Sequence, residues 1–133
     1  QGANTEFTIS GNLVEGNGRN AFPAIRIVFS KSGVMSGNVV INNFDGIVID
    51  GLPNNDASLA SSNWIIENNI AANTTARSQY SGIRLTALVR NITLRRNLCV
   101  NNGSSLGSQI MIANSASLNA DWKSANTRHY TPP

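Results

Sequence analysis

The chain repeats one pattern of apolar residues and asparagines four times, and this repeat constrains its fold more than any other feature. In the copy from Asn91 to Asn114, two short apolar runs flank Asn97, and a polar loop then leads to a third apolar run. The first asparagines of the four copies, Asn12, Asn38, Asn69 and Asn97, are 26, 31 and 28 residues apart. Repeats of about 20 to 50 residues are typical of solenoids, in which each unit packs on its neighbours.

Each copy contains three short runs in which apolar residues alternate, which is the period of a β-strand, and no run has the period of a helix. We therefore predict an all-β fold, a parallel β-solenoid of about four coils with three short strands each. Each strand would pair with its counterpart one coil on, about 4.8 Å away, so that like residues form columns. The columns predicted to point inward are Phe7/Gly33/Trp64/Ile92, Ile9/Met35/Ile66/Leu94, Leu13/Val39/Ile70/Leu98 and Ile25/Ile47/Ile83/Ile110. Glu15, in a column with Ile41, Ala72 and Val100, is the exception.

Asparagines recur at the bends between strands. A bend of one or two residues needs a left-handed backbone, which Asn tolerates better than other residues with a side chain. Stacked amides at successive bends can also hydrogen-bond to one another. We therefore predict a structural ladder of Asn12, Asn38, Asn69 and Asn97, and a second, less regular set of Asn17, Asn43, Asn73 and Asn102.

The second strand of each coil predicts an exposed apolar stripe. By alternation its outward residues would be Val14, Val40, Ala71 and Cys99. Soluble monomers avoid such stripes, so this one would pack against a neighbouring subunit in a trimer, or against the chain's own tail through Trp122 or Tyr130. Cys99 would then be a small apolar side chain, since no partner base is evident.

Composition excludes several classes of function. The 133 residues suit one domain, and 13% charged residues is low against roughly 25% in typical domains. The net charge of +3 is mild and the arginines are scattered, which argues against a nucleic-acid partner. A single cysteine allows no internal disulfide, no apolar run approaches the about 18 residues of a membrane span, and we expect no metal and no cofactor. Because the chain begins with Gln and has no signal peptide, we expect a processed or excised piece.

The repeat resembles the right-handed parallel β-helices of the pectate-lyase-like class. The residues that carry the resemblance are GIVIDG at 46–51, GIRLTA at 82–87, ISGN at 9–12, MSGN at 35–38 and IENN at 66–69. We expect coils over residues 1–114, followed by a polar tail or cap over 115–133. Because terminal coils expose unpaired strand edges, we expect the piece to continue a longer coil or to dock on another chain through its first turn. That class includes polysaccharide lyases, glycoside hydrolases, epimerases and bacteriophage tailspikes, so the resemblance specifies fold better than function.

In that class the sheet built from the third strands usually carries a glycan groove. Its outward columns here would be Arg26/Val48/Arg84/Met111 and Val28/Asp50/Thr86/Ala113. Asp50 and Asp45 are the candidate catalytic carboxylates, since paired carboxylates can cleave a sugar bond, and Arg26, Arg84, Tyr80 and Asp56 are the candidate substrate-binding residues. In the alternative interpretation, Asp50 and the arginines form solvated surface ion pairs. A calcium site at Asn54, Asn55 and Asp56 is the weaker hypothesis, because the usual calcium-loop pattern is absent.

Two classes of function follow. The first is part of a tailspike-like protein that binds or depolymerises a polysaccharide, by lyase or hydrolase chemistry if it is an enzyme. The second is a non-enzymatic structural or attachment module of a virion, in which the coil supplies rigidity and subunit contacts. Exposed aromatic residues that would stack on sugars are scarce, which disfavours the first. Either would be found outside the cell or on a virion surface.

Overall fold

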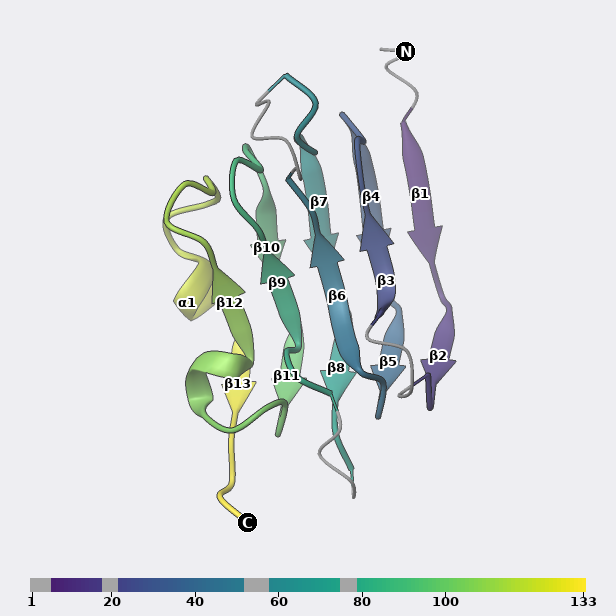
Figure 1. Cartoon of the computed structure of the whole chain (residues 1–133), viewed down its shortest axis with the longest axis vertical. Helices are drawn as coiled ribbons and strands as arrows, with labels where there is room; N and C mark the ends of the chain where they lie inside the picture. The colour runs from purple at the N-terminus through teal and green to yellow at the C-terminus, as the bar shows by residue number, and fades with distance from the viewer. Residues whose placement is uncertain (1–5, 18–21, 52–57, 75–78) are drawn as a thin grey trace.

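The strands pair in parallel throughout the part of the chain that the structure describes. The structure is a computed structural model, and it describes residues 6–17, 22–51, 58–74 and 79–133. Each strand pairs with its counterpart in the next coil, so three sheets run along one axis and form the sides of the coil (Figure 1). The predicted parallel β-solenoid of about four coils with three strands each is confirmed.

Each sheet collects one strand from every coil. Sheet A contains β1 (Phe7–Ser10), β4 (Gly33–Ser36), β7 (Trp64–Glu67) and β10 (Thr93–Arg95). Sheet B contains β2 (Leu13–Glu15), β5 (Val39–Ile41), β8 (Ile70–Ala72), β11 (Leu98–Val100) and β13 (Thr127–His129). Sheet C contains β3 (Pro23–Ile27), β6 (Asp45–Ile49), β9 (Ile83–Leu85) and β12 (Ile110–Ile112). Two short helices complete the fold, the 3₁₀-helix η1 (Leu106–Ser108) and α1 (Trp122–Ala125).

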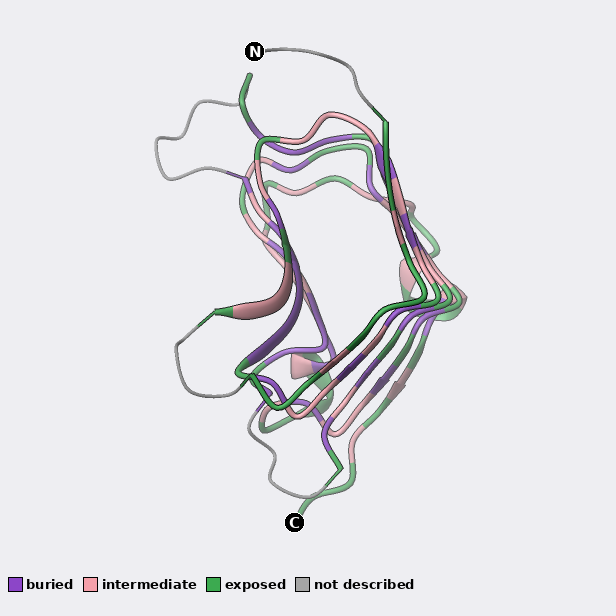
Figure 2. Ribbon diagram, turned by 90° about the vertical axis from the view of Figure 1, so that its right-hand side faces the viewer, coloured by how far each residue is buried: buried purple, intermediate pink, exposed green. Residues whose placement is uncertain are grey.

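The inward columns of sheets A and C form the core as predicted, except that Phe7 in the first coil is 52% exposed. Met35, Ile66 and Leu94 are fully buried and lie in register on neighbouring strands of sheet A. Ile47, Ile83 and Ile110 form the matching column of sheet C. Viewed along the stack, the coils superpose around this interior (Figure 2). Burial of these columns is the main source of stability for each coil, since a fully buried Ile, Leu or Met contributes about 1.5–3 kcal/mol.

The glycine in the first column makes room for the largest core side chain. Gly33 pairs with Trp64 one coil on, and a Cβ atom built on Gly33 would lie 2.4 Å from the Trp64 ring. The ring is buried, and its Nε1 donates a hydrogen bond to Ser30 Oγ at 3.2 Å. Glycine is therefore required at position 33 for the ring to lie flat against the preceding coil.

The facing predicted for sheet B is wrong. Val40, Ala71 and Cys99 are fully buried, whereas Leu13 is 65% exposed and Ile70 is 38% exposed. Val14 packs against the core as well, so the predicted exposed stripe lines the interior, and the predicted inward column faces outward. Glu15 is exposed and is no exception to the rule.

The position of the left-handed residue explains the reversal. At the first corner the residues with positive φ are Gly11, Gly37, Asn68 and Arg96, each directly before a ladder asparagine. The prediction that the asparagines themselves adopt the left-handed conformation is therefore wrong. The bend therefore ends one residue earlier than predicted, and the ladder asparagine is the first residue after it that points inward. The next residue points outward and the one after it inward, which reverses the predicted facing of sheet B.

The asparagine ladder itself is present and fully connected. In each rung the backbone N–H and Nδ2 donate to Oδ1 of the asparagine one coil on, as in Asn38 to Asn69 at 2.9 and 3.0 Å. The same pair of bonds joins Asn12 to Asn38, Asn69 to Asn97 and Asn97 to Asn126. Asn126, which the repeat pattern did not reveal, is thus a fifth rung.

The second ladder is interrupted by glutamines. Its amides connect in the order Asn17, Asn43, Gln79, Asn102 and Gln109. Asn73 bonds instead to the backbone of Gln79 and to the carbonyl of Asn101. Glutamine side chains, which are longer than those of asparagine, replace asparagine at two positions of this ladder. This replacement explains why the second set of asparagines is less regular in the sequence.

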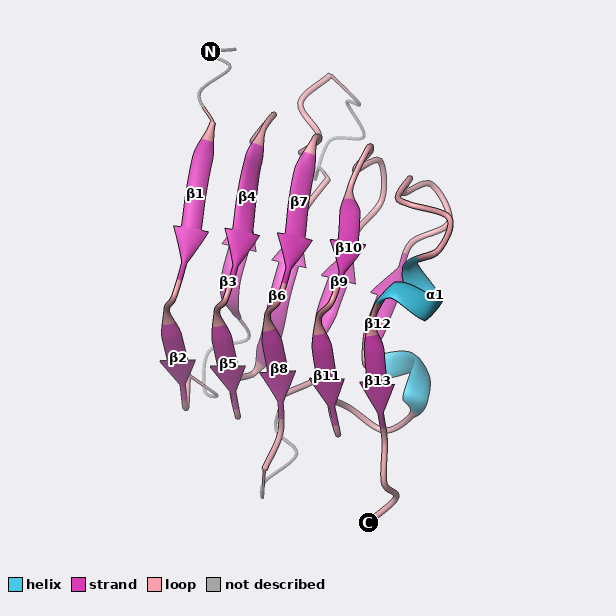
Figure 3. Cartoon of the chain, turned by 180° about the vertical axis from the view of Figure 1, so that it is seen from behind, coloured by secondary structure: helices cyan, strands magenta, loops and turns pink. Residues whose placement is uncertain are grey.

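The segment after Asn114 covers one end of the core. Leu118 forms a parallel bridge with Ile92, β13 pairs with β11, and α1 lies over β10 (Figure 3). Leu118 and Trp122 pack on the core, and the last rung ends where Asn126 Nδ2 donates to the Trp122 carbonyl at 2.7 Å. This end of the solenoid is therefore capped by the chain itself.

Candidate functional site

The outer face of sheet C brings together most of the residues singled out from the sequence. Its register aligns Arg26 with Val48, Val48 with Arg84, and Arg84 with Met111, as predicted. Val48 is only 2% exposed although it points outward, because the two arginine side chains flank it. The face is therefore an apolar strip bordered by two cations and their acidic partners.

Asp50 lies at the end of β6 and joins three consecutive coils. Its Oδ2 accepts hydrogen bonds from Arg26, with Nε at 2.9 Å, and its Oδ1 accepts one from Thr86 Oγ1 at 2.7 Å. The Thr86 hydroxyl in turn accepts the Gly51 N–H at 2.6 Å. Burial raises the pKa of Asp50, but the hydrogen bonds from Arg26 and Thr86 and the charges of Arg26 and Arg84 outweigh it and lower the pKa below its usual value. Asp50 is thus an ionised, fully bonded carboxylate.

Asp45 begins β6 and is almost completely buried. Its side chain is 3% exposed, and its Oδ2 lies 2.6 Å from Arg84 Nη2. Its Oδ1 accepts the N–H groups of Gly46 and Ser81, both at 3.1 Å, and the Ser81 hydroxyl. These bonds fix the corner where the strands of sheet C begin, which gives Asp45 a clear structural role.

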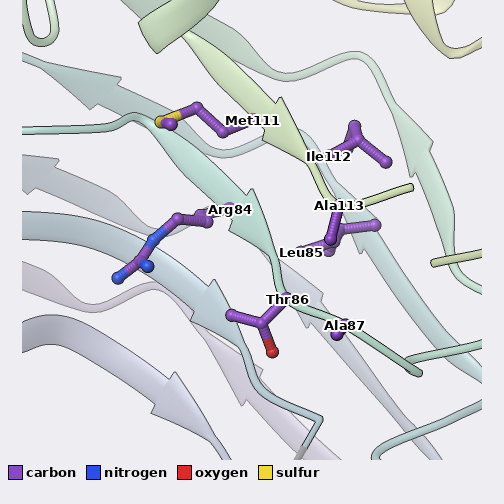
Figure 4. Close-up of a pocket in the computed structure, with 7 residues that line it drawn as sticks. All are labelled: Arg84, Leu85, Thr86, Ala87, Met111, Ile112 and Ala113. Carbon is purple, nitrogen blue, oxygen red and sulfur yellow. The ribbon is translucent and has the colours of Figure 1, made fainter. Parts of the chain in front are cut away.

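A shallow cavity lies on the same face between β9 and β12. It has a volume of about 300 Å³ and is lined by Arg84, Leu85, Thr86, Ala87, Met111, Ile112 and Ala113 (Figure 4). Its walls are mostly apolar, and the polar groups come from Arg84 and Thr86. Arg84 Nε is buried and has no hydrogen-bond partner in the described part of the chain. The cavity thus has a partly exposed cationic side chain at one edge, whose Nε lies beneath the surface.

The other candidates lie apart from this cavity. Tyr80 is 55% exposed and stands just before β9, at the opposite end of the sheet from Asp50, where its N–H donates to the Phe44 carbonyl. Asp56, Asn54 and Asn55 lie outside the described residues. Among the residues that are described, no three His, Cys, Asp or Glu side chains cluster closely enough to hold a metal ion.

Two arginines on sheet A form an ion cluster that the sequence reasoning missed. Arg95 donates to both carboxylate oxygens of Glu67, and Arg96 Nη2 lies 2.9 Å from Glu67 Oε2. The pKa of Glu67 is lowered, first by the Arg95 hydrogen bonds; burial, the next cause, raises it, and the charges of Arg95 and Arg96 lower it further. Glu67 and Arg95 stand in one outward column, so the alignment of the repeats could have revealed the pair.

Comparisons with known proteins add no relative. A scan against family models gives no match to this chain, and searches of curated proteins and of solved structures give none either. In the described ranges, no helix has the length and apolar character needed to cross a membrane. The chain is a parallel β-solenoid of about four coils with three sheets, and its function must be argued from its own surface.

Proposed function

We propose that this chain is a non-enzymatic structural module, a rigid β-solenoid that serves attachment or assembly. One observation carries the proposal: both candidate catalytic carboxylates have their oxygens occupied by internal partners. Asp45 is bonded to Arg84, Ser81 and Gly46, and Asp50 is bonded to Arg26 and Thr86. These contacts connect neighbouring coils, which is what a load-resisting scaffold needs.

The spacing of the two carboxylates also disfavours glycoside hydrolysis. They are at opposite ends of β6, five residue steps apart, which corresponds to about 16 Å between their Cα atoms. Paired catalytic carboxylates lie about 5–9.5 Å apart. A general acid also needs a raised pKa, whereas the pKa of Asp50 is lowered.

Assays on polysaccharides test this proposal. Wild type and Asp50→Asn would be incubated with acidic and neutral polysaccharides, with reducing ends measured for hydrolysis and unsaturated products for lyase cleavage. We expect no turnover by either protein. Activity of the wild type that Asp50→Asn loses, while Glu67→Gln on sheet A retains it, would overturn the proposal.

A second function is favoured by the cavity of sheet C. There, binding of an acidic sugar without cleavage is supported by the apolar lining at Met111 and by Arg84, whose side chain is 36% exposed and can present guanidinium N–H groups to a carboxylate. Calorimetry with uronate oligosaccharides should then show binding that weakens at least tenfold in Arg84→Lys. Equal affinity in both proteins, or no binding by wild type, would remove this function.

The motifs of the repeat support a setting for either function. On their basis we propose that the coil is of the right-handed, pectate-lyase-like kind and acts on a virion or outside the cell, in a tailspike or a related appendage. A polysaccharide partner and a homo-oligomeric assembly belong to this same proposal. Mass spectrometry of purified virions tests this setting: detection of the chain would support a virion appendage, and its absence would contradict one.

A further inference from the structure

We propose that the outer face of sheet B is a self-association surface, on which two copies of this chain pack with their solenoid axes antiparallel. The face consists of two outward columns that run the length of the sheet, namely Leu13/Val39/Ile70/Leu98/Thr127 and Glu15/Ile41/Ala72/Val100/His129. This inference deepens the structural role proposed above and takes its biological meaning from that role.

The face is apolar along four consecutive coils. Leu13, Ile70 and Leu98 are 65%, 38% and 36% exposed, and Val39, Ile41, Ala72 and Val100 are partly exposed beside them. The inner residues of the same strands are buried in the core, whereas these outward side chains are left only partly buried by folding of the single chain. A contiguous apolar surface of this kind is characteristic of a protein contact.

The other two outer faces are polar by comparison. Sheet A presents Glu67 and Arg95 as an ion pair, and sheet C presents Arg26 and Arg84 with their acidic partners. Sheet B has three strands without a polar residue, β5, β8 and β11, and among its strands β2, β5, β8 and β11 the only charged side chain is Glu15. The apolar surface is therefore specific to one face of the solenoid, which an interface requires.

A carboxylate at one end of the face and an imidazole at the other select the partner and its orientation. Glu15 lies on β2 at one edge of sheet B, and His129 lies on β13 at the other, in the same column and both exposed. A two-fold axis along the central strand β8 places Glu15 of each copy against His129 of the other, and Ile70 against its own counterpart. A parallel arrangement of two or three copies would instead bring the glutamates to one level, where like charges repel.

The size of the face predicts a reversible association. Five strands about 4.8 Å apart give a face about 20 Å long, and its strands are only three residues wide. Such a surface lies at the low end of specific interfaces, where contacts are transient. We therefore expect monomer and dimer to exchange with protein concentration.

Disulfide trapping tests the orientation. Glu15→Cys and His129→Cys would be mixed under mild oxidation, and the products separated on non-reducing gels. The two positions are four strand spacings, about 19 Å, apart in one chain, so a mixed disulfide requires antiparallel copies. Cys99 will not interfere, because burial raises the pKa of its thiol to about 12. We expect the mixed disulfide to exceed either homodimer at least fivefold; homodimers of Glu15→Cys alone, or no disulfide, would overturn the proposal.

The association itself is tested by light scattering over a range of concentrations. Ile70→Lys places two ammonium groups against each other at the centre of the interface and should leave only monomer. Ile65→Lys, on the outer face of β7 in the same coil, is the matched control and should dimerise as the wild type does. A wild type that stays monomeric or forms a trimer, or equal effects of both lysines, would overturn the proposal. The polysaccharide assays above do not depend on this result, so the two proposals fail separately.

Discussion

The first coil and the central coils use the same residues with different burial. Ile9 and Ile66 occupy one inward column, but Ile66 is fully buried and Ile9 is partly exposed. Asn12 and Asn69 are rungs of one ladder, but Asn12 is exposed and Asn69 is 1% exposed. A central side chain is enclosed by a coil on each side, whereas one in the first described coil has a described neighbour on one side only. The contribution of a repeated residue is therefore set by its neighbours along the stack.

Truncation of the two isoleucines should give the largest difference. Ile66→Ala leaves a cavity between two packed coils and should lower the free energy of unfolding by about 4 kcal/mol, within the range of buried Ile-to-Ala changes. Ile9→Ala removes a side chain that is partly in water and should cost about 1 kcal/mol. Urea unfolding followed by circular dichroism measures both. Equal losses would show that the first coil is as well enclosed as the centre.

Substitution of a central and of a terminal ladder asparagine should give a smaller difference in the free energy of unfolding. Asn69→Ala removes the acceptor of two Asn38 donors and the donor to Asn97 Oδ1, and leaves buried polar groups without partners. Because each such group costs about 1–3 kcal/mol, we expect a loss of about 3 kcal/mol. Asn12→Ala leaves groups that water can reach, so its loss should be about 1 kcal/mol. Thermal unfolding of both variants beside the wild type checks this order, and a larger effect of Asn12→Ala would contradict it.

The smallest expected effect concerns Asp50, which ties the first coil to the second and third through Arg26 and Thr86. Its pKa in the folded state is lowered below the usual 3.8, so the carboxylate stabilises the fold above that pH and the contribution is lost as the pH falls through the folded pKa. Asp50→Asn should therefore cost about 1 kcal/mol at pH 7 and almost nothing well below that pKa. Unfolding curves of wild type and Asp50→Asn across this pH range measure the difference in their free energies of unfolding. A difference that does not change with pH would show that packing, and not the charge of Asp50, is responsible.

The architecture could be predicted from the sequence because the repeated asparagines and apolar residues occupy equivalent positions in successive coils and stack on one another. The asparagine spacing predicted the coils, and the inward columns of sheets A and C were largely correct because strands such as β1, which reads FTIS, and β9, which reads IRL, alternate polar with apolar residues. Sheet B offered no such contrast: β5 reads VVI and β11 reads LCV, so alternation alone gives no facing. Glu15 was the one informative residue, and placing it outward would have corrected the whole sheet.

The sequence predicted which residues of the candidate site lie near one another, but it did not predict which of them form ion pairs and hydrogen bonds. The columns placed Asp50 beside Arg26, and the structure pairs them. Arg84, expected beside Asp50, pairs with Asp45, because that carboxylate lies within reach across the corner. Side-chain reach, hydroxyl contacts such as that of Thr86, and the fifth rung at Asn126 depend on the folded geometry, and no spacing in the sequence specifies them.

The connected amides of the first corner have a consequence for how such a chain can change. Successive rungs are 26, 31, 28 and 29 residues apart, yet every rung makes the same two bonds to the next. The ladder bonds thus fix the alignment of successive coils, and this alignment does not depend on the number of residues between two rungs. Insertions and deletions in the loops can accumulate without shifting a strand, so surfaces formed by loops can diversify while the scaffold beneath keeps its geometry.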